Sequence, residues 1–224
     1  MPHRIAVSVT TPEKCAEGEQ IARHLHLPVQ SGSTRVLGEM RRRYTRDSYL
    51  ELVAEIREML PEVALSTDMI VGFPGETAAD FEETLSLTAA VRYHSMFSFK
   101  YSQRPNTLAE KRLPDDVTEN EKTRRIVALQ TLQRAIQTEL NEALVGQEVE
   151  VLVDAASRRR DTELSGRTSG NTVVNLPGPA SWIGRTVRVR VERAGAHSVW
   201  GRAAFALIAP GTADAVVDSA ASGA

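Results

Sequence analysis

The stretch "STDMIVGFPGETAADFEETL", Ser66 to Leu85, predicts a β-strand that leads directly into an α-helix. Its first part is apolar and β-branched, as is typical of a buried strand. Pro74 and Gly75 close the strand, because neither residue favours its continuation. Thr77 followed by Asp80 has the spacing of a capping box, which predicts an amphipathic helix from this point. The stretch is therefore one strand-loop-helix unit.

Similar units lie on both sides of it. Upstream, the strand-length run "HLHLPV" (24–29) precedes two helical patterns, "STRVLGEMRRR" (33–43) and "DSYLELVAEIREML" (47–60). Asp47 is the expected cap of the second helix. Downstream, "SMFSFKYS" (95–102) predicts a third strand whose apolar side chains pack on both faces. Three such units in a row predict an α/β fold with a parallel sheet covered by helices.

The pattern changes after residue 117. Thr118 and Glu121 form a capping-box pattern that begins a long helix, which Gly146 ends. Short β-type segments split by Gly, Asn and Pro then follow without an intervening helix, which predicts a small antiparallel β-barrel. These segments are "EVEVLVD" (148–154), "ELSGRT" (163–168), "TVVNL" (172–176), "TVRVRVERA" (186–194) and "SVWGRAA" (198–204).

Composition limits the class of protein. The chain has 224 residues, a formal net charge of -2 and one cysteine, Cys15. No stretch resembles a signal peptide or a membrane helix, so we expect a cytoplasmic protein. A single cysteine excludes an internal disulfide and a cysteine-based metal site completed by this chain alone.

The C-terminal part is more basic than the rest. Residues 156–202 contain nine arginines and three acidic residues. A basic excess on the scale of a domain favours binding to a phosphate backbone. The alternative is an arginine-rich surface that is simply solvated.

Polar loops follow each predicted strand: "QSGS" (30–33), "GFPGET" (72–77) and "SQRPNT" (102–107). Ligands bind at the carboxyl ends of parallel strands, where such loops gather. The hydroxyls and the amide of the first loop suit a ribose or a carboxylate. The glycines of the second loop allow the backbone to approach a flat ring closely. In the third loop, Arg104 suits a carboxylate or a phosphate. The alternative for each loop is a turn chosen for its backbone geometry.

His24 and His26 share one face of their strand, because side chains alternate. Asp68 is the acidic residue expected at a matching position on the neighbouring strand. Metal binding by the two histidines is one interpretation. The other is a role in the interior of a barrel without a metal, which does not require a third ligand.

The same residues carry a resemblance to a family. "HLHLPVQSGSTRVLGEMRRRYT" (24–45), "STDMIVGFPGETAADFEETL" and "FSFKYSQRPNTLAEK" (97–111) resemble the second half of the radical S-adenosylmethionine (SAM) barrel of the methylthiotransferases. "LVGQEVEVLVD" (144–154) through "WIGRTVRVRVERAGAHSVWGRA" (182–203) resembles their TRAM domain, a small OB-like RNA-binding barrel. The resemblance implies a partial radical SAM barrel with connector helix at 24–143 and a TRAM domain at 144–207. Residues 1–23 do not read like the family's preceding barrel segment, so they are expected to be an atypical segment. Residues 208–224 are mostly small and have little to bury, which predicts a disordered tail.

Within this family the chain looks most like the members that methylthiolate isopentenyladenosine beside the anticodon of tRNA. The resemblance implies a tRNA anticodon stem-loop as partner and a monomeric protein that does not bind membranes. Sister members, which modify threonylcarbamoyl-adenosine in tRNA or a ribosomal protein, are an alternative.

The resemblance also implies site residues. The "IVGFPGE" segment would lie along the adenine of SAM, the "QSGS" loop would line its ribose or methionine end, and two arginines would bind a carboxylate or a substrate phosphate. The expected cofactor-binding residues are Gln30, Ser31, Ser33, Arg42, Asp68, Ile70, Gly72, Glu76 and Arg104. The expected RNA-binding residues are Arg158, Arg159, Arg167 and Asn171.

The sequence departs from the family in its cysteines. Intact members bind SAM and two [4Fe–4S] clusters, held by a three-cysteine domain and a C-x-x-x-C-x-x-C motif. Neither pattern occurs here, so we expect no metal-binding or catalytic residue in this chain and no activity from it alone. A non-catalytic tRNA-binding remnant is the alternative to a portion of an enzyme.

Overall fold

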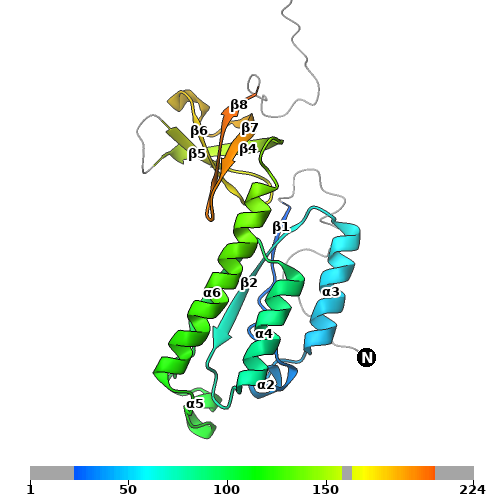
Figure 1. The fold of residues 1–224 in the computed structure, drawn as a ribbon, viewed down its shortest axis with the longest axis vertical. Coiled ribbons are helices and arrows are strands. Elements are labelled where there is room, and N and C mark those ends of the chain that lie inside the picture. The colour runs from blue at the N-terminus through cyan, green and yellow to red at the C-terminus, as the bar shows by residue number, and fades with distance from the viewer. Residues whose placement is uncertain (1–22, 158–162, 205–224) are drawn as a thin grey trace, which may run out of the picture.

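The computed structural model describes residues 23–157 and 163–204. It has two parts, a parallel sheet covered by helices and a closed β-barrel, and the long helix α6 (Glu119–Glu142) runs from the first to the second (Figure 1). The α/β fold class expected from the sequence is confirmed. The expected tail at 208–224 and most of the segment 1–23 lie outside the described residues.

The sheet has three parallel strands in the order β1-β2-β3, which are His24–His26, Ala64–Val71 and Ser95–Lys100. The central strand pairs on both sides, with His26 opposite Ser66 and Asp68 opposite Phe97. Because side chains alternate along a strand, β2 sends one row of residues into the helical layer and the other to the open face of the sheet. The row in the helical layer is fully buried.

Three longer helices and two short ones accompany the sheet. They are α2 (Thr34–Glu39), α3 (Arg46–Met59), α4 (Ala78–Val91), α5 (Leu108–Arg112) and α6. Apolar side chains of α3, α4 and α6 pack on one face of the sheet in a single core. The capping box of Thr77 and Asp80 is present at the start of α4, as predicted.

The cap predicted for α3 is wrong. The helix begins one residue before Asp47, and Thr45 is its N-cap: the Thr45 hydroxyl accepts from the Ser48 amide, and the Ser48 hydroxyl accepts from the Thr45 amide. Asp47 lies in the first turn instead, where its negative charge still favours the positive end of the helix dipole.

The expectation that β3 packs on both faces is also wrong. Met96 packs against the helical core, but Phe97 and Phe99 on the other face are 58% and 53% exposed. This face of β3 is therefore open to solvent, although Ala64 and Ser66 of β2 on the same side of the sheet are buried.

The second part is a barrel of five strands, closed in the order β4-β5-β6-β8-β7. The strands are Glu148–Ala156, Glu163–Arg167, Val173–Pro177, Thr186–Ala194 and Val199–Ala203 for β4 to β8. Their inward residues, mostly valines, form a separate core. The predicted antiparallel barrel needs one correction, because β6 and β8 pair in parallel and so close the barrel. A short 3-10 helix (Ala180–Trp182) also lies where no helix was expected.

Hydrogen bonds between described residues connect the barrel to α6 and to the start of β1. The Asn141 side chain near the end of α6 donates to the Gly195 carbonyl in the β7–β8 turn, at 2.7 Å. The Arg23 amide beside β1 donates to the Ser169 hydroxyl in the β5–β6 turn, at 2.8 Å. Among the described residues, no helix is long and apolar enough to cross a membrane.

Candidate functional site

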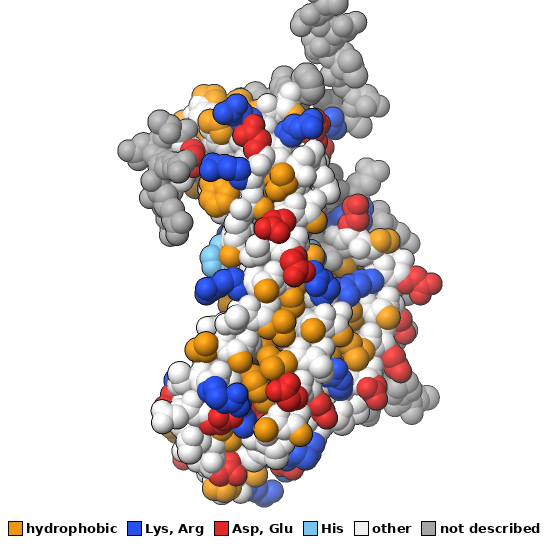
Figure 2. Space-filling model, viewed as in Figure 1, with side chains coloured by type: hydrophobic (Ala, Val, Ile, Leu, Met, Phe, Trp, Pro, Cys, Tyr) orange, Lys and Arg blue, Asp and Glu red, His pale blue; other side chains and the backbone are white. Residues whose placement is uncertain are grey.

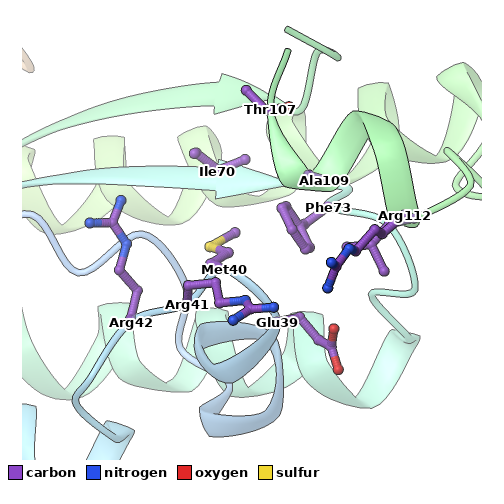
Figure 3. Close-up of a pocket in the computed structure, with 10 residues that line it drawn as sticks. Glu39, Met40, Arg41, Arg42, Ile70, Phe73, Thr107, Ala109 and Arg112 are labelled. Carbon is purple, nitrogen blue, oxygen red and sulfur yellow. The ribbon is translucent and has the colours of Figure 1, made fainter. Parts of the chain in front are cut away.

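A cavity of about 340 Å³ opens at the carboxyl end of β2. It lies between the turn that follows α2 and the short helix α5 (Figure 3). This is the end of a parallel sheet at which ligands bind, and the volume is in the range of small-molecule sites. Its lining residues are Glu39, Met40, Arg41, Arg42, Ile70, Phe73, Thr107, Ala109, Arg112 and Leu113.

One wall of the cavity is apolar. Ile70 at the end of β2 and Phe73 in the following loop form it together with Met40. Phe73 is buried and meets the ring of Tyr101 edge to face, with the ring centroids 5.1 Å apart. This contact fixes the aromatic ring, so the wall is a preformed surface for a flat or apolar group.

The other wall is basic. Arg41, Arg42 and Arg112 line it, against the single carboxylate of Glu39. None of the three guanidinium groups forms an ion pair or side-chain hydrogen bond with another described residue. In Figure 3, Arg41 and Arg112 point toward each other, whereas Arg42 extends in another direction beside Ile70. The cavity therefore combines an apolar surface with an excess of positive charge, which suits an anionic ligand that carries a ring.

A buried ion pair between Glu76 and Arg125 stabilises the loop that follows β2. Arg125 of α6 donates to the Glu76 carboxylate at 2.6 Å, and the Gly72 amide donates to the same oxygen at 2.6 Å. The side chains of Arg125 and Glu76 are 5% and 0% exposed, respectively. Burial raises the pKa of Glu76, and the bonds from Gly72 and Arg125 oppose that rise. Glu76 thus fixes the shape of the loop and does not line the cavity.

Gly72 has a positive φ of 72°, and a Cβ there would lie 2.4 Å from Cγ of the Lys122 side chain. The space that glycine leaves is therefore occupied by α6. Lys122 is held in turn by Asp115, at 2.7 Å.

The "QSGS" loop is also engaged within the fold. Ser33 is the N-cap of α2, and its hydroxyl donates to Asp80 of α4 at 2.6 Å. Although burial alone would raise it, hydrogen bonds from Arg35, Ser33 and Thr77 hold the pKa of Asp80 well below its usual range. Ser31 is buried and accepts from the Ser33 amide. Gln30 has a positive φ of 75°, and its backbone forms an isolated parallel β-bridge with Met69 of β2.

His26 and Asp68 lie together on the open face of the sheet. His26 Nε2 is 3.5 Å from a carboxylate oxygen of Asp68, and its Nδ1 is 2.9 Å from the Ser66 hydroxyl. His24 shares this face, but its pKa is lowered by burial and by the nearby charges of His26 and Arg167. No group of three metal-ligating side chains occurs among the described residues. In the structure, His26 therefore has polar partners within the sheet, namely Asp68 and Ser66.

Of the nine residues expected to contact a cofactor, the cavity brings together Arg42 and Ile70. Arg104 lies exposed in the loop between β3 and α5 and does not line it. Arg41, Phe73 and Arg112 also line the cavity and were not predicted from the sequence. Arg41 stands next to Arg42 in "MRRRYT" and Phe73 lies within the "GFPGET" loop, so both were predictable from the sequence. Arg112 was not, because its approach depends on the path of the chain after β3.

In the barrel, Arg167 and Asn171 come together at the β5–β6 turn. The Arg167 guanidinium donates to the Asn171 side-chain oxygen at 2.8 Å and lies 3.6 Å from Asp154. Both residues are exposed. Arg158 and Arg159 lie outside the described residues. Figure 2 shows basic side chains interspersed with acidic ones on one face of the molecule, so no patch of a single sign covers this face.

Two family models match this chain. The radical SAM superfamily model matches residues 4–88, and the TRAM domain model matches residues 142–204. Both matches agree with the predicted resemblance to a radical SAM segment followed by a TRAM domain. The radical SAM match includes most of the segment 1–23, whose atypical character stays a prediction.

Curated relatives narrow this class. The tRNA-2-methylthio-N(6)-dimethylallyladenosine synthase of Moorella thermoacetica is 50% identical over 79% of this chain and 39% of that protein. The proteins of the same name from Acetivibrio thermocellus and Coxiella burnetii are 47% and 42% identical, over 78% and 89% of this chain and 36% and 45% of theirs. The chain is thus similar to a portion of these relatives and spans less than half the length of each.

One solved structure, coproporphyrinogen III oxidase (HemN) from Escherichia coli, described as a radical SAM enzyme, overlaps with a TM-score of 0.42. The sequence identity is 14%, and the overlap covers 80% of this chain and 45% of that chain.

Proposed function

We propose that this chain supplies part of the cofactor site and the RNA-binding barrel of a tRNA methylthiotransferase that acts on isopentenyladenosine beside the anticodon. The observation that carries the proposal is the cavity at the carboxyl end of β2, with its apolar wall and its arginines that pair with no residue in the described ranges. Relatives that share this sequence are named for the same reaction. A role on tRNA would place the protein in the cytoplasm, and we expect it to act as a monomer.

The apolar wall of the cavity and Arg42 fit the adenine ring and the carboxylate of SAM, whose sulfonium and amino groups are positively charged. Ile70 and Phe73 would contact the ring, and Arg42 would bind the carboxylate. Bound SAM, reduced by an iron–sulfur cluster, supplies radical chemistry. Gly72 and Glu76 would act indirectly, because their bonds fix the loop that carries Phe73. Gln30, Ser31 and Ser33 would likewise support the site through the fold.

The residues present do not fit an iron–sulfur cluster. The resemblance implies three cysteine thiolates for each of two [4Fe–4S] clusters, and this chain has one cysteine. We therefore propose that the chain alone does not carry out the reaction, and we derive no catalytic step from it.

The barrel would bind the anticodon stem-loop. Its exposed Arg167 and Asn171 lie together at one turn, and Arg158 and Arg159 belong to the β4–β5 connection. Arginine side chains that neutralise phosphates release counterions, so such binding must weaken as the salt concentration rises.

Two binding measurements on the purified chain test the proposal. Equilibrium dialysis with labelled SAM should show binding that the substitution Arg42→Gln weakens and the substitution Arg43→Gln does not, because Arg43 is an exposed neighbour outside the cavity. Fluorescence anisotropy with a labelled anticodon stem-loop RNA should show binding that declines with salt. Binding to neither ligand would refute the proposal.

A specific observation favours the second function, a non-catalytic tRNA-binding protein: the chain has too few cysteines for a cluster. Salt-dependent RNA binding together with no SAM binding would support it. Sister methylthiotransferases gain no comparable support, and a preference for threonylcarbamoyl-adenosine RNA over isopentenyladenosine RNA would be needed to favour them.

A further inference from the structure

Arg41 and Arg112 form a pair of like charges for which the described residues supply no counter-ion. They approach from different elements, Arg41 from the turn after α2 and Arg112 from the last turn of α5, and point into the same space (Figure 3). Neither makes an ion pair or side-chain hydrogen bond with any described residue. Glu39, the carboxylate that also lines the cavity, pairs with neither of them.

Four other arginines of this part of the molecule have partners within the fold. Arg35, Arg46, Arg57 and Arg125 all bind carboxylates or backbone carbonyls of neighbouring elements. The backbone of Arg41 is held, since its amide donates to the Gly38 carbonyl at 3.0 Å and its φ is 61°. The turn therefore fixes the direction of the Cα–Cβ bond of Arg41, and in Figure 3 its side chain extends toward Arg112.

Two guanidinium groups that converge on one space suit a ligand with several acceptor oxygens and a full negative charge. Each guanidinium presents donors in a planar fork that matches a phosphate. SAM has one carboxylate, for which Arg42 is the proposed partner, and Arg42 extends away from this pair. A second anion would account for the convergence of the remaining two arginines, whose side chains are exposed.

We propose that Arg41 and Arg112 bind a backbone phosphate of the RNA substrate, at the rim of the cavity that takes SAM. This inference rests on the proposed function and adds an RNA contact far from the barrel. The 24 residues of α6 lie between the cavity and the barrel, which corresponds to about 36 Å of helix. An RNA that contacts both must extend over a comparable length, as a folded stem-loop does.

The test is the salt dependence of RNA binding by the full chain. The affinity for a labelled anticodon stem-loop is measured by anisotropy at several salt concentrations, for the wild type and for the double variant Arg41→Gln/Arg112→Gln. Losing one phosphate contact should lower the slope of log affinity against log salt by about 0.7 to 1. Arg43→Gln is the matched control, because Arg43 is exposed in the same run but does not line the cavity.

A second variant, Arg41→Lys/Arg112→Lys, keeps the charges and removes the planar forks. It should retain the slope and lower the affinity, which a general effect on folding would not do. Circular dichroism checks that every variant is folded, as expected for substitutions at exposed side chains.

An unchanged slope in the double glutamine variant would overturn the inference while the proposed function stands. Loss of SAM binding in that variant, with RNA binding intact, would overturn it in favour of a carboxylate site. No RNA binding by the wild type would refute the RNA part of the proposed function and this inference with it.

Discussion

Replacing Arg125 by methionine should destabilise the sheet part of the molecule strongly. The change leaves the Glu76 carboxylate buried, with the Gly72 amide as its remaining donor. It also removes the bond from Arg125 to the Glu76 carbonyl and its contact with the Phe81 ring. Methionine keeps an unbranched chain with good helix propensity, so the loss reflects the missing charge and donors more than a change in the helix.

The magnitude follows from the burial of the two side chains. Removing one partner of a buried ion pair typically costs about 3–5 kcal/mol, because the other charge is left uncompensated. Burial already raises the pKa of Glu76, so the carboxyl of the variant can take up a proton and become neutral. The cost should therefore shrink as the pH falls toward the raised pKa. The double variant Glu76→Gln/Arg125→Met should recover part of the loss at neutral pH.

The assay is urea unfolding followed by two signals. Far-UV circular dichroism reports mainly on the helices, while Trp182 and Trp200 both lie in the barrel part and report on it by fluorescence. The dichroism transition should shift to lower urea, and the fluorescence transition should shift less.

Arg124→Met is the matched control, with the same substitution one residue earlier on the same helix. Arg124 pairs with Glu121 on the exposed surface, where ion pairs contribute little. If Arg125→Met destabilises the protein no more than Arg124→Met does, the reasoning from the buried pair is refuted.

Three further predictions concern the fold. Gly32→Ala should destabilise the chain by about 1–3 kcal/mol in urea unfolding, because the added Cβ would lie 2.4 Å from the α4 backbone. Gly38→Ala lies within α2 and has nothing near its Cβ, so it should instead stabilise the chain by about 0.5–1 kcal/mol. A Gly32→Ala variant that is more stable than the Gly38→Ala variant would show that the loop at Gly32 adapts to the added Cβ. Burial lowers the pKa of His24 and of His94 in the folded chain, so the unfolded chain binds protons more readily, and stability should fall as the pH drops below about 6.5. A double histidine-to-glutamine variant should flatten that urea-midpoint profile, and an equally steep profile would contradict the assignment. Asn141→Ala removes the bond to the β7–β8 turn and should speed amide hydrogen exchange there, while unchanged exchange would show that the contact does not hold the barrel.

The sequence by itself determined the elements and their order. The strand-turn-helix pattern around Thr77 and Asp80 was correct because a cap depends on residues three positions apart. The alternation of apolar and polar residues placed the barrel strands for the same local reason. The family was also evident from the sequence, since several unusual strings recur in one order, and the comparisons confirm it.

Where two local solutions compete, the sequence was ambiguous. Thr45 and Asp47 can each cap a helix, and the choice of Thr45 depends on the reciprocal bond that Ser48 makes. The exposure of one face of β3 could likewise not be predicted, because Phe97 and Phe99 are apolar and no neighbouring residue in the sequence indicates that this face is open to solvent.

Tertiary structure decided the site. Glu76 was expected to face a cofactor, but Arg125, which follows it by 49 residues, binds it in the interior. Arg41 and Arg112 converge only because the turn after α2 and helix α5 pack around the same end of the sheet. Burial and the pairing of charges depend on which distant segments meet. Local patterns therefore determined the elements of this protein, and packing determined which of its polar groups remain free to bind a ligand.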